Sequence, residues 1–154
     1  MMVDKVNSVS FGASLQTALR TPEAKLFMSA GERFQELTRK FPKDKLILQK
    51  DPLDKIFPTF TISGGNDFTT NISNDFVKFD STKNPTELVR KLVKTFKMLV
   101  ECRKINTLMD QLDPDGDEFA KAAEASIKRM QKTAGKDGGL QEFVGAIKAG
   151  LGIE

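Results

Sequence analysis

Apolar residues alternate with polar ones near the start of the chain and then recur at helical spacing. The alternation ends before residue 20 and predicts a half-buried strand. Its apolar positions are Val9, Phe11, Ala13, Leu15 and Leu19. A short helix over residues 14–19 is the competing interpretation, because Gly12 weakens a strand. From Thr21 the apolar spacing becomes three and four residues, and Pro42 interrupts it. This second pattern predicts one amphipathic helix that Thr21 caps and Pro42 ends.

The segment between residues 46 and 80 has a different character. It contains four runs rich in Leu, Ile, Phe, Thr or Val, at residues 46–49, 57–63, 68–73 and 76–80. Gly, Asn and Asp residues separate the last three runs. The Asn74-Asp75 connection has only two residues, and such a short connection favours an antiparallel hairpin. The pattern therefore predicts three or four strands joined as a meander.

Three helical patterns follow. The sequence Asn84-Pro85-Thr86-Glu87 is a strong helix start, with a capping side chain and a proline at the first helical position. A long helix with a broad apolar face then reaches the Asp113-Pro114-Asp115-Gly116 break. A third helix follows over residues 118–133, and a short last helix lies around residues 140–147.

These elements together predict an α+β fold. Its sheet is an antiparallel β-meander of three to five strands with one helix packed across it. A long amphipathic helix and two shorter C-terminal helices follow. The whole of residues 1–154 fits one domain, with frayed ends at residues 1–8 and 150–154. Apolar and charged fractions of 39% and 29% are ordinary for a folded protein.

The composition excludes several kinds of chemistry. The chain has no His, so it cannot form Ser–His or Cys–His nucleophile pairs or the usual zinc sites that contain His. Its single cysteine, Cys102, cannot form an intramolecular disulfide. We expect no cofactor. The sequence shows neither a signal peptide nor a run of about 18 apolar residues, so we expect a cytoplasmic protein without membrane contact.

One loop resembles a calcium site in its spacing of acidic residues. Four carboxylates occupy positions 1, 3, 5 and 12 of an EF-hand loop: Asp113, Asp115, Asp117 and Glu124. Position 6 of such a loop requires Gly, but Glu118 stands there. The alternative favours a helix start, in which Asp115 caps and Glu118 completes a capping box. We prefer this alternative and expect no metal.

The long helix carries the candidates for nucleic-acid binding. Four basic residues share one stripe of it and could contact phosphates: Arg90, Lys94, Lys97 and Lys104. The alternative is an ordinary solvated helix face, since Glu101 and other acidic residues interrupt the stripe. The net charge of +3 is too small to decide between them.

No acid–base pair or cofactor loop stands out in the sequence. We therefore predict a non-catalytic binding or scaffolding module that interacts with another protein or with itself. Three alternatives stay open: nucleic-acid binding through the long helix, a calcium-binding helix–loop–helix at residues 113–124, and an enzyme that uses only Asp, Glu or Lys. The sequence does not identify the partner, the oligomeric state or the strand order.

Overall fold

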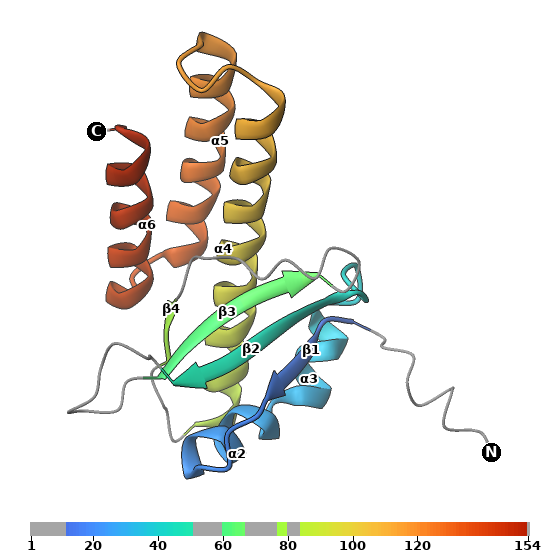
Figure 1. Cartoon of the computed structure of the whole chain (residues 1–154). Coiled ribbons are helices and arrows are strands. Elements are labelled where there is room, and N and C mark those ends of the chain that lie inside the picture. Colours follow the sequence, from blue (N-terminus) through green and yellow to red (C-terminus); the bar gives the residue numbers. More distant parts are fainter. Residues whose placement is uncertain (1–11, 51–59, 67–76, 80–83, 154) are drawn as a thin grey trace. The chain divides into compact units, whose positions relative to one another are not determined.

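A computed structural model describes residues 12–50, 60–66, 77–79 and 84–153 (Figure 1). Contacts between residues divide the chain into an N-terminal unit, residues 1–93, and a C-terminal unit, residues 94–154. The described part is mostly helical and has one small sheet. In chain order its elements are β1 (Ser14–Thr17), α2 (Pro22–Ser29), α3 (Gly31–Leu37), β2 (Asp44–Lys50), β3 (Phe60–Asn66), β4 (Val77–Lys78), α4 (Pro85–Gln111), α5 (Asp117–Ala134) and α6 (Gly138–Leu151).

The sheet corrects the predicted fold class, because it is not an antiparallel meander. Its strand order is β1-β2-β3-β4, and β1 pairs with β2 in parallel, with Leu15 beside Leu46. The pairs β2–β3 and β3–β4 are antiparallel. Parallel strands need a long crossover, and α2 and α3 form that crossover between β1 and β2 (Figure 1). The prediction considered only short turns and so missed this pairing.

Two short helices also replace the one helix predicted before Pro42. Thr21 caps α2 as expected, since its hydroxyl accepts a hydrogen bond from the Ala24 backbone N–H at 3.2 Å. The helix then breaks at Ala30, and α3 begins at Gly31, a residue that weakens a helix interior. The apolar spacing carries through the break, which is why sequence periodicity did not reveal it.

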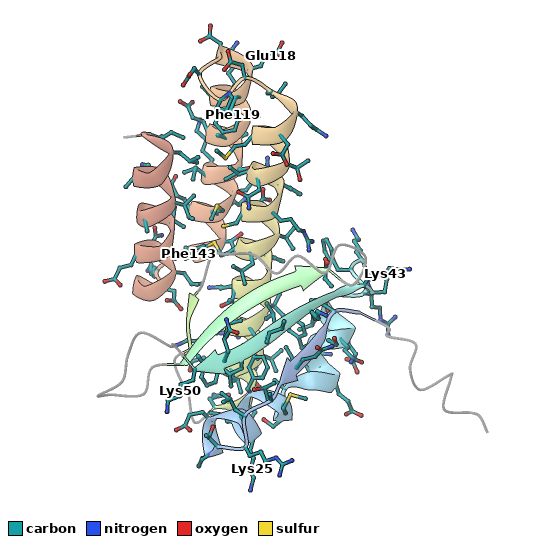
Figure 2. All side chains as sticks on the ribbon, in the orientation of Figure 1. Lys25, Lys43, Lys50, Glu118, Phe119 and Phe143 are labelled. Atoms are coloured by element: carbon teal, nitrogen blue, oxygen red, sulfur yellow. The ribbon has the colours of Figure 1, made fainter. Side chains whose placement is uncertain are left out.

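The core of the N-terminal unit lies between the sheet and its helices. Along β2, alternate residues are buried, and Leu46 and Leu48 are almost completely enclosed. Phe27 of α2 meets Phe79 edge to face, with ring centroids 5.9 Å apart. Figure 2 marks Lys43 just before β2 and Lys50 at its end.

A buried polar clamp fastens the segment before β1 to the end of α3. The Thr38 hydroxyl accepts a hydrogen bond from the Ala13 backbone N–H at 2.9 Å and donates one to the Phe34 carbonyl at 2.8 Å. Beside it, a Cβ atom on Gly12 would lie 2.0 Å from the Gln35 carbonyl oxygen. The backbones therefore approach more closely than any side chain at residue 12 permits.

Four of the predicted strand runs lie partly or wholly outside the described residues. The residues outside are 9–11, 57–59, 68–73, 76 and 80, and the predicted frayed end at residues 1–8 is also outside.

The C-terminal unit consists of the later part of α4 with α5 and α6. Its apolar side chains follow the predicted helical spacing, and α5 buries one continuous stripe. That stripe comprises Phe119, Ala123, Ser126, Ile127, Met130 and Ala134. The α6 helix is longer than predicted, and Gly152 closes it in the left-handed conformation with φ of 72°. None of the described helices combines the length and apolarity needed to cross a bilayer.

The start of α5 differs in detail from the expected capping box. Gly116, not Asp115, is the N-cap residue, and no side chain bonds to the first turn there. Asp113 instead accepts a hydrogen bond from the Asp115 backbone N–H at 3.0 Å, and its carbonyl accepts one from Gly116 at 2.9 Å. The aspartates thus form a tight turn before the helix rather than a cap on it.

Candidate functional site

A cluster of polar side chains joins α4 to α5 within the C-terminal unit. Arg129 of α5 grips Glu101 of α4 with two hydrogen bonds of 3.0 Å, from Nε to Oε2 and from Nη2 to Oε1. Its Nη2 also donates to the hydroxyl of the buried Ser126 at 2.9 Å. Lys104 lies 3.6 Å from the same carboxylate. We refer to these four residues as the polar cluster.

The electrostatics of the cluster favour the ionised form of Glu101. Its side chain is only 12% exposed, whereas that of Arg129 is 53% exposed. Burial raises the pKa of Glu101, but the Arg129 hydrogen bond, the charges of Lys104 and Arg129 and the Ser126 hydroxyl together hold it below its ordinary value. The hydrogen bond to Glu101 raises the pKa of Arg129. The arrangement is a two-point ion pair between helices.

The four basic residues predicted for nucleic-acid binding all lie on α4. Arg90 is exposed and belongs to the N-terminal unit. The other three belong to the C-terminal unit, where Lys97 and Lys104 are exposed and Lys94 is half-buried. Glu101 lies on the same stripe, one turn from Lys97 and one from Lys104. Glu101 was the argument against phosphate binding by this stripe, and Arg129 neutralises its negative charge.

The ion pair also places α5 side chains against this stripe. The short connection over residues 112–116 makes α4 and α5 antiparallel neighbours (Figure 1). Arg129 of α5 lies opposite Glu101 of α4, and the two helices run in opposite directions. Lys97, four residues before Glu101, therefore lies at nearly the same height along the helix pair as Lys132, three residues after Arg129. Lys132 is exposed. Lys132 is three residues from Arg129, so the two side chains lie on the same side of α5. We define the basic face as the cations of the α4 stripe in this unit and these two residues of α5: Lys94, Lys97, Lys104, Arg129 and Lys132.

The calcium candidates are spread along an exposed loop and helix. Asp113 and Asp115 lie in the turn, and Asp117 begins α5, where Figure 2 marks the neighbouring Glu118 and Phe119. Glu124 is seven residues further along the helix, an axial distance of about 10 Å. Calcium ligands must all lie within about 2.6 Å of the ion. Among the described residues, no three Asp, Glu or Cys side chains are placed to share a metal ion.

The outer face of α6 has an unusual composition. The helix packs against α5 through Leu140 and Val144, which are buried. Its opposite side is exposed and almost free of large side chains. This outer face comprises Gly138, Glu142, Gly145, Ala146 and Ala149. A Cβ atom added to Gly138 or Gly145 would meet no heavy atom of the described residues within 4 Å, so packing within this part of the chain does not require glycine there.

Sequence reasoning located the α4 stripe but missed its α5 partners. Arg129 and Ser126 lie 28 and 25 residues from Glu101, and only the packing of two helices brings them together. A possible signal was the position of Arg129 beside the apolar stripe of α5. Cys102, expected near the edge of the apolar face, is 2% exposed.

Comparison of the chain with protein-family models, with curated proteins and with solved structures finds no match.

Proposed function

We propose that the chain is a non-catalytic binding module that holds a helix of another protein against the outer face of α6. The observation that carries the proposal is the glycine and alanine surface on the exposed side of this helix. An exposed glycine within a helix costs about 1 kcal/mol relative to alanine. Gly145 lies in the middle of α6, and in the part of the chain that the structure describes no atom lies within 4 Å of where its Cβ would be.

A close helix–helix contact gives such a surface a purpose. Small residues let two backbones approach more closely than larger side chains allow, which increases the van der Waals contact between them. Only Glu142 and Lys148 carry charge in the 14 residues of α6. Charged residues are depleted at the cores of protein interfaces and abundant on ordinary solvated helices. With Glu142 as its one charged residue, the outer face is closer in composition to the core of a protein interface than to an ordinary solvated helix face.

The non-catalytic part of the proposal rests on the residue types available. Without His, acid–base catalysis would need an Asp, Glu or Lys with a strongly shifted pKa. The pKa of Glu101 is lowered, and this shift favours the charged form that an interhelical ion pair uses. Structural ion pairs perturb pKa values in the same way.

Site-specific cross-linking tests the proposal. A photo-reactive amino acid replaces Ala149 on the outer face of α6 or, as a matched control, Ala120 on the exposed side of α5. We expect a discrete adduct with another protein from position 149 only. That protein, once purified, should bind Ala149→Lys at least tenfold more weakly than wild type and bind Ala120→Lys unchanged. Equal labelling from both positions, or adducts only between copies of the chain, would overturn the proposal.

A further inference from the structure

We infer that the basic face of the C-terminal unit binds the phosphate backbone of double-stranded nucleic acid. The inference goes beyond the proposed protein interaction, since it uses α4 and α5 and not the outer face of α6. Its starting point is charge. Five cations lie on this face, and Glu101 is the acidic residue of the α4 stripe among them. The face as a whole is therefore strongly positive, although the whole chain carries only +3.

The polar cluster gives this face a fixed geometry. Arg129 holds α5 to α4 through two hydrogen bonds, so the rows of cations on the two helices keep their spacing. Packed helices lie about 8–10 Å apart. Lys97 and Lys104 are separated by two turns along α4, about 10 Å. The cations thus spread over an area that matches several successive phosphates rather than one small anion.

The residue types on the basic face indicate which kind of polyanion it binds. Proteins that hold single strands stack bases on aromatic side chains. The α4 stripe and the facing edge of α5 contain no aromatic residue between residues 94 and 132 that is exposed. An anionic membrane would favour apolar or aromatic side chains beside the cations. Lysine contacts to backbone phosphates, without base recognition, suit a duplex of any sequence.

The charge distribution also predicts how the duplex lies. Five acidic residues crowd the turn between α4 and α5, at Asp110, Asp113, Asp115, Asp117 and Glu118. They repel phosphate, so binding concentrates on the part of the helix pair that holds Lys97 and Lys132.

Fluorescence anisotropy with a labelled 20-base-pair DNA duplex, and with one strand of it alone, tests the inference. Three or four phosphate contacts predict that raising the salt from 50 to 200 mM weakens duplex binding by roughly 40- to 150-fold. The single strand should bind no more tightly than the duplex. Lys97→Gln combined with Lys104→Gln should reduce the slope of log K against log salt by about 2. The matched control, Arg39→Gln with Lys40→Gln, removes two exposed cations from the N-terminal unit and should change neither quantity.

A variant of opposite sign completes the test. Glu101→Gln removes the acidic residue from the basic face and leaves an amide oxygen that can still accept from Arg129. We expect it to tighten duplex binding several-fold at 50 mM salt. The inference is overturned if the duplex does not bind, if both double variants weaken binding equally, or if vesicles containing anionic lipid bind while the duplex does not.

Discussion

The two units use their polar side chains in opposite ways. In the N-terminal unit, Thr38 is 4% exposed, and both hydrogen bonds of its hydroxyl go to backbone groups of the same unit. In the C-terminal unit, the Glu101–Arg129 pair lies at the surface, with the arginine half exposed and further cations around it. The Thr38 hydrogen bonds hold buried backbone segments together, whereas the Glu101–Arg129 pair fixes the positions of charges at the surface.

This difference indicates where each kind of residue contributes. Buried hydrogen bonds cost much free energy when one partner is removed, because the other partner is left without water. Exposed ion pairs contribute little to stability but fix charges in space. Substitutions in the N-terminal unit should therefore act on folding, and those on the surfaces of the C-terminal unit should act on binding.

The largest expected effect on stability is a difference between two glycine-to-alanine substitutions, one in each unit. Gly12→Ala would place a Cβ atom 2.0 Å from the Gln35 carbonyl oxygen, so the strand or α3 must move. We expect a loss of about 3 kcal/mol in the free energy of unfolding, measured by chemical denaturation. Gly145→Ala meets open space in a helix and should gain about 0.5–1 kcal/mol. Changes of the same sign at both positions would contradict the comparison.

A smaller effect is expected from the clamp itself. Thr38→Val keeps the shape of the side chain but leaves the buried Ala13 N–H without its acceptor. The expected cost is about 1–3 kcal/mol in the free energy of unfolding. Thr38→Ser retains the hydroxyl and serves as the control. If serine destabilised the protein and valine did not, packing of the methyl group and not the hydrogen bond would hold this segment.

The loss of stability expected at Glu101 is smaller than at Gly12 or Thr38, and it depends on pH. Because the folded-state pKa of Glu101 lies below its unfolded value of about 4.3, the ionised carboxylate stabilises the fold above that pH. The stabilisation is lost as the pH falls through the depressed pKa. Solvent around the half-exposed Arg129 limits it to about 1 kcal/mol.

Denaturation of wild type and Glu101→Gln between pH 7 and 2.5 measures this effect. The difference between them should be full at pH 7 and vanish at the acid end. Glu36→Gln, which breaks the exposed Arg33–Glu36 pair, should give a smaller difference. A Glu101→Gln difference that stays constant with pH would assign its effect to packing instead of charge.

Local signals in the sequence predicted much of the helical part of the fold. Thr21 and Asn84 cap their helices as expected, and the Asn84 side chain accepts from the Thr86 N–H at 2.9 Å. Such contacts span two or three residues, so the sequence alone displays them. The predicted Asp115 cap failed because Asp113 forms a turn that shifts the helix start to Gly116.

Contacts between distant residues were not predictable in this way. The parallel pairing of β1 with β2 depends on a crossover whose geometry no short motif encodes. Only part of the basic face could be predicted from the sequence. Its α4 residues share one helix, whereas Arg129 joins them only after α5 packs against α4. The outer face of α6 was also missed, because small residues in a short helix give no periodic signal.

The parallel pairing has a consequence for the order of folding. Leu15 and Leu46 are 31 residues apart in the chain, whereas Lys50 and Phe60, the nearest ends of β2 and β3, are 10 apart. Closing the longer loop costs about 1 kcal/mol more in chain entropy. The β2–β3 pair should therefore form early, and β1 should join it after α2 and α3 exist. During synthesis β1 leaves the ribosome first among the described strands, but it can pair only after β2 has been made.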